Sequence, residues 1–285
     1  MTDKTTMNRR QALSLVAITA AGGAMLSQQA FAAETGATAA QTTTLMPGAD
    51  VCVITPEVTE GPYYFDPKME RLDITEGRPG VPTRIKLQVV DATCAPMSGA
   101  RVDIWHADAT GLYSGYANQG NDGTTDTTGQ TFMRGTVFTN VSGIAEFVTT
   151  YPGWYRGRTT HVHFKVFLDT TNILTGQIFF PDALSEYIYL NVPPYSDRGA
   201  ERDTLNSNDN IAAQATRASF AYVKEMEAEY LVAMIIGVDP NATSMGMPVG
   251  GATQSGNRPA GPRPDAGIAA PAGASGSRGS LVPGV

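Results

Sequence analysis

The sequence predicts an all-β fold, an antiparallel β-sandwich with long loops and little helix, and three observations support it. The 285 residues include 30 glycines and 18 prolines, which favours short strands joined by turns over a helical bundle. Several segments alternate apolar and polar residues with the period of two that indicates a strand with one buried face. Turn sequences such as Pro-Met-Ser-Gly separate those segments.

The strands follow one another along the middle of the chain. They are expected at residues 84–91, 100–108, 131–139, 143–151, 160–168 and 230–239. In the first of them Ile85, Leu87 and Val89 alternate with polar residues. The third and fourth are expected to form a hairpin around Asn140–Gly143. The stretch 212–229 is the one segment that the pattern predicts to be helical.

Composition divides the chain into four parts. Residues 51–240 carry the strand pattern and are expected to form one folded β-sandwich domain. Residues 33–50 are small and polar and are expected to be a linker. Residues 241–285 are mostly Gly, Pro, Ala and Ser, a composition that buries too little apolar surface to fold, so we expect a low-complexity, disordered tail. Residues 1–32 are predicted to be a twin-arginine signal peptide.

The signal-peptide prediction rests on two features. Arg9 and Arg10 precede a mild apolar stretch, which is shorter than the roughly 20 residues of a membrane span. Ala30-Phe31-Ala32 then has the small-x-small pattern of a cleavage site. The expected location is therefore periplasmic or extracellular, by twin-arginine export; an ordinary N-terminal helix is the alternative.

Charge and cysteine content limit the remaining possibilities. The formal net charge is −7 and there is no basic run, which is unlike a nucleic-acid-binding protein. Cys52 and Cys94 are the only cysteines and have no CxxC spacing. In an oxidising compartment they are expected to form a disulfide, contributing about 3–4 kcal/mol through loop closure. Two buried free thiols are the alternative.

Two of the three histidines lie in "RTTHVHFK", residues 158–165, at positions i and i+2. On a strand these positions share one face, so His161 and His163 point the same way with Cα atoms about 6.6 Å apart. Val162 points to the other face. The spacing lets two imidazoles reach one metal ion, although two strand histidines with ordinary hydrogen bonds would give the same pattern. No carboxylate is placed to complete a site of two histidines and one carboxylate.

Tyrosines lie near the histidine pair in the sequence. Tyr151 and Tyr155 occur in "TTYPGWYRGR", and Tyr113 occurs in "ADATGLYSGY". A trivalent cation can hold a phenolate at neutral pH although the side chain ordinarily titrates near ~10. Phenolates are hard anionic donors that favour Fe(III); the alternative for each tyrosine is a packed amphipathic ring.

Motifs spread along the folded part resemble a known family. "TPEVTEGPYYFD" (55–66), "VDIWHADATGLYSGY" (102–116), "YPGWYRGRTTHVHFKVF" (151–167), "TGQIFFPD" (175–182) and "PPYSDRGAERDTLNSND" (193–209) are similar to the intradiol ring-cleavage dioxygenases. The resemblance is to the protocatechuate-dioxygenase-like branch, particularly its exported members, and the motifs occur in the same order.

The resemblance implies a non-haem Fe(III) cofactor and its ligands. The two tyrosine ligands of the family correspond to Tyr113 and Tyr155, and its two histidine ligands to His161 and His163. Tyr155 is preferred to Tyr151 because it occupies the place after Pro-Gly-x. Tyr155 would also be the catalytic proton acceptor.

Further residues receive roles from the same resemblance. The active-site arginine corresponds to Arg158, expected to act in catalysis and substrate binding, and the catalytic glutamine to Gln177. A surface salt bridge for Arg158 and an exposed strand position for Gln177 are the alternatives. Tyr63 and Tyr64 are expected to line the substrate pocket or to serve packing alone. His106 has no role in the family and is expected to be structural.

The implied function is insertion of both atoms of O2 into a catechol-type aromatic diol. The ring opens between the two hydroxylated carbons to a cis,cis-muconate-type diacid, without an organic cofactor. A homodimer is compatible with the sequence, which does not fix the oligomeric state. "IKLQVVDATCAPMSGARVDIW" also resembles transthyretin-like, non-catalytic binding modules. A zinc-type hydrolase is the weaker alternative, because no carboxylate is placed as general base.

Overall fold

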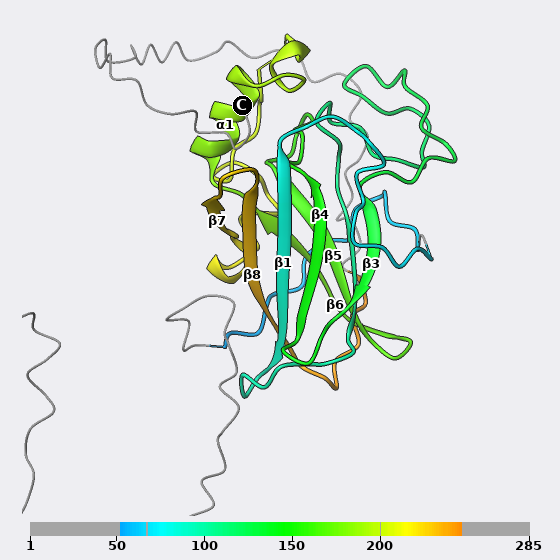
Figure 1. Cartoon of the computed structure of the whole chain (residues 1–285), viewed down its shortest axis with the longest axis vertical. Coiled ribbons are helices and arrows are strands. Elements are labelled where there is room, and N and C mark those ends of the chain that lie inside the picture. The colour runs from blue at the N-terminus through cyan, green and yellow to red at the C-terminus, as the bar shows by residue number, and fades with distance from the viewer. Residues whose placement is uncertain (1–51, 67, 200, 247–285) are drawn as a thin grey trace, which may run out of the picture. The chain divides into compact units, whose positions relative to one another are not determined.

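A computed structural model describes residues 52–66, 68–199 and 201–246. Eight strands form two four-stranded sheets, and the described part contains a single α-helix, α1 (Asp182–Asn191). The all-β sandwich expected from the sequence is confirmed (Figure 1). Among the described residues no helix combines the length and the apolar character that crossing a membrane requires.

The first sheet has the strand order β4-β1-β8-β7. Its members are β1 (Pro82–Asp91), β4 (Ile144–Thr150), β7 (Tyr222–Glu225) and β8 (Tyr230–Val238). β1 lies between β4 and β8 (Figure 1). It pairs antiparallel with β4 and parallel with β8, so the sandwich is not purely antiparallel.

The second sheet has the order β3-β2-β5-β6 and is antiparallel throughout. Its members are β2 (Arg101–Trp105), β3 (Arg134–Phe138), β5 (His161–Leu168) and β6 (Thr171–Phe179). β5 is an inner strand, flanked by β2 and β6, so a side chain on β5 has neighbours from both.

One hydrophobic core fills the space between the sheets. It includes alternate residues of β1 and β5: Ile85, Leu87, Val89, Val162, Phe164 and Val166. Because side chains alternate along a strand, the other residues of β5 face away from this core. The outer face of the second sheet therefore carries the histidine pair.

The expected hairpin around Asn140–Gly143 is wrong. The tight turn exists, with the Gly143 N–H donating to the Asn140 carbonyl at 2.8 Å. However, β3 pairs with β2 and β4 pairs with β1, so the turn carries the chain from one sheet to the other. A local turn signal does not tell which strands pair, because that depends on distant partners.

The helix expected over 212–229 is also wrong. This stretch contains a short 3-10 turn, Arg217–Ser219, and then the edge strand β7. β7 pairs with β8 from Tyr222 opposite Ala233 to Glu225 opposite Tyr230. Pairing with a neighbouring strand overrides the weak local helix preference.

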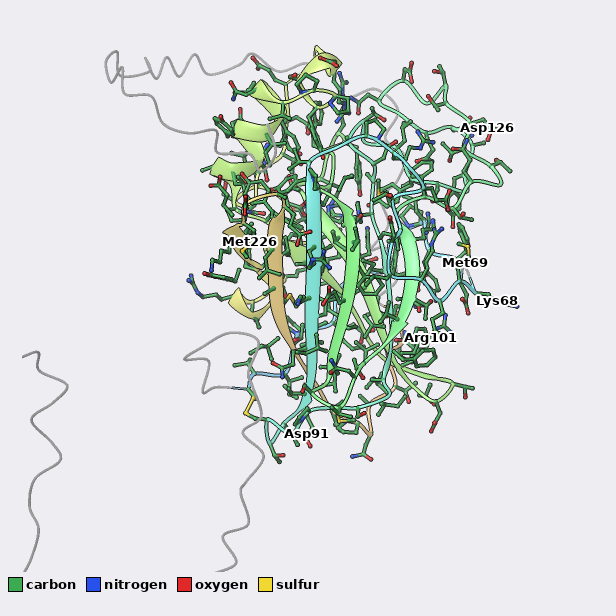
Figure 2. All side chains as sticks on the ribbon, viewed as in Figure 1. Lys68, Met69, Asp91, Arg101, Asp126 and Met226 are labelled. Atoms are coloured by element: carbon green, nitrogen blue, oxygen red, sulfur yellow. A yellow bond between two sulfur atoms is a disulfide. The ribbon has the colours of Figure 1, made fainter. Side chains whose placement is uncertain are left out.

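The disulfide between Cys52 and Cys94 is present, with Cα atoms 5.4 Å apart. It lies beside Asp91, at the end of β1 (Figure 2). The predicted signal peptide (1–32) and linker (33–50) lie outside the described residues, as does most of the predicted tail. The first residues after 240 contact the sandwich, since Ser244 Oγ lies 2.8 Å from Thr175 Oγ1.

Candidate metal centre

The outer face of the second sheet positions the centre of the site. His163 on β5 lies opposite Trp105 on β2 and opposite Gln177 on β6. Residues opposite each other in a sheet project from the same face, so these three side chains and His161 share one surface. Both histidines are nevertheless buried, and Gly61 and Tyr113, from segments outside the strands, lie against His163.

Four donor atoms converge above this surface. The Nε2 atoms of His161 and His163 are 3.1 Å apart. The Tyr113 hydroxyl lies 3.3 Å from His161 Nε2 and 3.1 Å from His163 Nε2. The Tyr155 hydroxyl lies 3.1 Å from His161 Nε2 and 3.4 Å from the Tyr113 hydroxyl. We call these four side chains the donor cluster.

The two tyrosines come from different loops. The backbone of Tyr113 is held on both sides, because its N–H donates to Gln119 Oε1 at 3.2 Å and its carbonyl accepts from Thr127 Oγ1 at 2.6 Å. Tyr155 forms a bridge with Arg158 in the turn before β5. Tyr151 is not in the cluster: its hydroxyl lies 2.8 Å from Ser185 Oγ.

Each histidine is oriented by a different contact. His161 Nδ1 donates to the Thr159 carbonyl at 2.6 Å, which leaves a lone pair on Nε2 facing the cluster. His163 Nδ1 is buried without a hydrogen-bond partner, and its ring stacks on Trp105 with centroids 4.8 Å apart at 11°. Gly61 approaches the same ring, since a Cβ there would lie 3.2 Å from His163 Cε1.

Burial controls the protonation of these groups. It raises the pKa of the Tyr113 and Tyr155 phenols above their ordinary value. It lowers the pKa of the His161 and His163 imidazoles well below theirs. Without a cation, the cluster thus holds two neutral phenols and two neutral imidazoles. A bound cation reverses the preference of a phenol, because it stabilises the phenolate.

The donor cluster fits a metal ion. Ligand bonds of about 2.0–2.1 Å in a tetrahedral arrangement place donor atoms roughly 3.3–3.4 Å apart. The distances observed within the cluster, 3.1 to 3.4 Å, are close to that spacing. Residues 52–246 contain, where described, no group of three or more His, Cys, Asp or Glu side chains suited to a metal. Tyrosine ligands are therefore needed to complete the site.

Arg158 and Gln177 meet at the edge of the donor cluster. Arg158 Nη2 donates to Gln177 Oε1 at 2.5 Å, and Arg158 Nη1 lies 3.4 Å from His161 Nε2. Gln177 Nε2 donates to the Thr59 carbonyl at 2.9 Å. Both ends of the Gln177 amide thus contact the protein, and its side chain orients Arg158. Neither residue is the exposed side chain that the alternative readings required.

Tyr63 and Tyr64 lie beside the cluster. The Tyr63 ring stacks on Tyr113 with centroids 4.7 Å apart. The Tyr64 ring contacts Trp105, and its hydroxyl donates to Asp103 Oδ2 at 2.9 Å. His106 is buried, with Nδ1 donating to the Ala107 carbonyl at 2.8 Å, as expected of a structural residue.

Sequence reasoning missed two residues beside the site. Arg134 is 1% exposed and donates to the carbonyls of Tyr63 and Ser114 at 2.6 and 2.7 Å, joining the two segments that carry the site tyrosines. Asp209 is 2% exposed and accepts from Arg158 Nε at 2.9 Å. Asp209 lies in the quoted motif 193–209, but nothing local distinguishes it from the other acidic residues there.

Known proteins share this architecture. Residues 59–192 match the protein-family model described as "Dioxygenase". An intradiol ring-cleavage dioxygenase from Tetranychus urticae has a similar structure, with a TM-score of 0.62 and 30% sequence identity; the match covers 68% of this chain and 98% of that chain.

Two catechol dioxygenases are similar in sequence. Catechol 1,2-dioxygenase 1 of Acinetobacter lwoffii is 29% identical over 146 residues, which are 43% of this chain and 45% of that protein. Catechol 1,2-dioxygenase of Acinetobacter baylyi is 25% identical over 209 residues, 65% of this chain and 64% of that protein. Both matches span less than two thirds of those relatives. From its family match and its structural neighbour, the chain belongs to the intradiol ring-cleavage dioxygenase family.

Proposed function

We propose that this chain is a non-haem Fe(III) enzyme that inserts both atoms of O2 into a catechol-type aromatic. The ring is cleaved between the hydroxylated carbons to a cis,cis-muconate-type diacid. The observation that carries the proposal is the convergence of two phenol and two imidazole groups, in which five donor-to-donor distances lie between 3.1 and 3.4 Å. Tyr113, Tyr155, His161 and His163 are the proposed ligands.

The protein side chains have separate roles in this proposal. Fe(III) held by these four residues would supply a Lewis acid that favours ionisation of the catechol hydroxyls. Tyr155 accepts a proton from a substrate hydroxyl, because it is only partly buried while its oxygen lies within the donor cluster, 3.1 Å from His161 Nε2. Arg158 places a positive charge beside the cluster, where negative charge develops on the substrate. Gln177 holds Arg158 in that orientation, and Tyr63 offers a ring surface next to Tyr113.

The branch and the substrate form the finer part of the proposal. We propose a protocatechuate-dioxygenase-like, exported member of the family. The similar Acinetobacter proteins are named catechol 1,2-dioxygenases, so catechol is the first substrate to test, with protocatechuate and hydroxyquinol after it.

The test combines absorption with isotope labelling. The chain purified in air should be red-brown from phenolate-to-Fe(III) charge transfer, and catechol added without oxygen should shift the band to longer wavelength. With 18O2, both labelled atoms should appear in one ring-opened diacid. A chain that stays colourless after ferric reconstitution and consumes no O2 would refute the enzyme and favour the transthyretin-like binding module.

Substitution of one histidine tests the ligand assignment. His161→Ala removes a donor that lies within 3.3 Å of each of the other three. We expect this variant to lose its iron and its visible band. Full stoichiometric iron in His161→Ala would show that the ligand set is wrong.

We also propose twin-arginine export followed by cleavage after Ala32. The support is the Arg9-Arg10 pair, the Ala30-Phe31-Ala32 site and the disulfide, which suits an oxidising compartment. Export of a folded chain allows iron to be loaded in the cytoplasm. Replacement of Arg9 and Arg10 by Lys should retain the chain in the cytoplasm, as measured by fractionation. The mass of the exported chain should correspond to a start at Ala33.

A further inference from the structure

Asp209, a buried carboxylate in the loop after α1, occupies both of its oxygens with protein donors. Its Oδ2 accepts from Arg158 Nε at 2.9 Å and from the Thr159 N–H at 2.8 Å. Its Oδ1 accepts from the N–H groups of Ile211 at 2.7 Å and Ala212 at 3.1 Å. The carboxylate is therefore fixed by the backbone on both sides and presents a rigid acceptor to Arg158.

The guanidinium of Arg158 is held at two of its three nitrogens. Nε bonds Asp209 at 2.9 Å, and Nη2 bonds Gln177 at 2.5 Å. Because the guanidinium is planar, two fixed contacts also set the direction of the third nitrogen. That nitrogen, Nη1, lies 3.4 Å from His161 Nε2, at the donor cluster.

The same carboxylate is linked to a histidine of the cluster. Asp209 accepts from the Thr159 N–H, and the Thr159 carbonyl accepts from His161 Nδ1 at 2.6 Å. The loop that carries Asp209 makes two further contacts with this segment. Thr159 Oγ1 donates to Asn206 Oδ1 at 2.9 Å, and the Gly157 N–H donates to Asp203 Oδ1 at 3.0 Å.

We infer that Asp209 is a positioning residue that directs the free edge of Arg158 to the substrate side of the donor cluster. The inference rests on the proposed function and adds a residue to it. An amide cannot take over this role. Asparagine has one acceptor oxygen, and its NH2 group would face two of the N–H donors that Asp209 now satisfies.

A matched control is available in the same region. Asp182 accepts from Arg202 Nη1 at 2.9 Å and from the Asn206 N–H at 3.1 Å. It thus pairs with an arginine and a backbone amide, as Asp209 does, but its bonds include neither Arg158 nor His161. Asp182→Asn removes an ion pair whose carboxylate side chain is more exposed, 33% against 1% for Asp209, and which reaches the site segment through Asn206.

The first test measures kcat with catechol per bound iron in the full-length holoenzyme. We expect Asp209→Asn to lower it about 10- to 100-fold, and Asp182→Asn to leave it within twofold of wild type. In an Arg158→Ala background, Asp209→Asn should cause a much smaller loss than in wild type, because only the contact with the Thr159 N–H then remains to be disturbed. The inference would be overturned if Asp209→Asn kept more than half of the wild-type turnover. It would also be overturned if the losses of Arg158→Ala and Asp209→Asn multiplied in the variant that carries both.

If Asp209→Asn does not fold, Arg158→Lys tests the same contact between Arg158 and Asp209 by changing the arginine instead. Lysine keeps the charge but cannot bond Asp209 and Gln177 together while directing a third nitrogen at the cluster. It should therefore lose turnover to the same extent. Wild-type turnover in Arg158→Lys would contradict the inference.

A second readout is independent of activity. In the full chain loaded with diamagnetic Ga(III), the Arg158 Nε–H signal reports its hydrogen bond by NMR. We expect Asp209→Asn to speed its exchange with water at least about 10-fold, and Asp182→Asn to leave it unchanged. Unchanged exchange in Asp209→Asn would refute the positioning. The expected exchange in the Ga(III) chain, together with no O2 uptake by the Fe(III)-loaded wild-type chain with catechol, would support the positioning and refute the proposed function.

Discussion

Tyr151 and Tyr155 lie four residues apart in one segment, yet their hydroxyl groups face different parts of the protein. Tyr155 lies 3.1 Å from His161 Nε2, whereas Tyr151 lies 2.8 Å from Ser185 Oγ in the hydrophobic core region. The two therefore form a matched pair for testing the role of a phenol at the site. Each loses only its oxygen when replaced by phenylalanine.

Tyr155→Phe should largely keep iron, because the phenyl ring still fills this part of the site, whereas His161→Ala leaves a hole beside all three other donors. The visible band of Tyr155→Phe should weaken, because one phenolate is lost. Turnover per iron should fall by about 100-fold, the usual effect of losing a positioned proton acceptor. Tyr151→Phe should lose about 1 kcal/mol of stability through its hydrogen bond and keep normal turnover. Iron content, absorption and O2 uptake measure these effects. Normal turnover in Tyr155→Phe would contradict its assigned role.

His106 makes stability depend on pH. Burial lowers the pKa of His106 from its ordinary 6.5 to about 4. Above pH 6.5 both the folded and the unfolded chain hold a neutral imidazole. Between pH 6.5 and 4 the unfolded chain binds a proton that the folded chain does not, so the free energy of unfolding falls as the pH falls.

The expected contribution of His106 is a loss of about 2 kcal/mol between pH 7.5 and pH 5. His106→Gln cannot titrate and should lack this part of the pH dependence, whatever its stability at pH 7.5. Urea unfolding of both chains at the two pH values gives the difference. Equal losses in the two chains would show that His106 is protonated in the folded state.

At the level of elements, β5 and β6 are in close contact through a glycine. Gly176 lies opposite Phe164, and a Cβ at position 176 would fall 2.3 Å from the Phe164 ring. Real Cβ atoms do not approach another atom so closely, so an alanine would displace the ring. Phe164 is fully buried in the core and has little room to move.

Gly176→Ala should therefore destabilise the protein by about 1–3 kcal/mol. Phe164→Leu frees space at the same position, so the double variant should lose less than the sum of the two single losses. Unfolding free energies of the four chains complete the cycle. Additive losses would mean that the ring and the new methyl group do not compete for the same volume.

The strands were predictable because each has its own local pattern. Alternation over 84–91 and 160–168 predicts β1 and β5, and the apolar run 230–239 predicts β8. The pairing was not predictable, since the turn at Asn140–Gly143 looks the same whether its strands pair or separate. The helix expected over 212–229 was wrong because an edge strand there is stabilised by β8 rather than by its own sequence.

The histidine pair of the donor cluster was predictable from spacing, because His161 and His163 share a face on any strand, whereas Tyr113 and Tyr155 were expected from the resemblance to the family. The surroundings of the cluster were not predictable, since they come from contacts between distant segments. Arg158 and Asp209 are 51 residues apart, and Arg134 joins segments near Tyr63 and Ser114. No spacing in the sequence indicates which acidic residue of a polar loop will be buried against a given arginine.

On the scale of the whole folded part, the Cys52–Cys94 disulfide ties the start of the described chain to the end of β1. From Cys52 the chain continues along β8, where the Thr55 N–H donates to the Gly237 carbonyl at 2.9 Å. It then passes β6, where the Val58 N–H donates to the Thr175 carbonyl at 3.1 Å. These bonds anchor the segment before it reaches the site.

Replacing both cysteines by serine should therefore separate stability from activity. Without the disulfide the unfolded chain has more conformational entropy. The free energy of unfolding should therefore fall by about 3–4 kcal/mol, and Tm by roughly 10 °C. Iron content and turnover at 25 °C should stay at wild-type values. The backbone bonds of Thr55 and Val58 still hold the segment up to Thr59, whose carbonyl accepts from Gln177. Thermal unfolding measures the loss of stability, and iron content and O2 uptake measure metal retention and activity, in the wild-type and double-serine chains. Lost iron in the double-serine chain would show that the disulfide, rather than these bonds, holds the segment at the site.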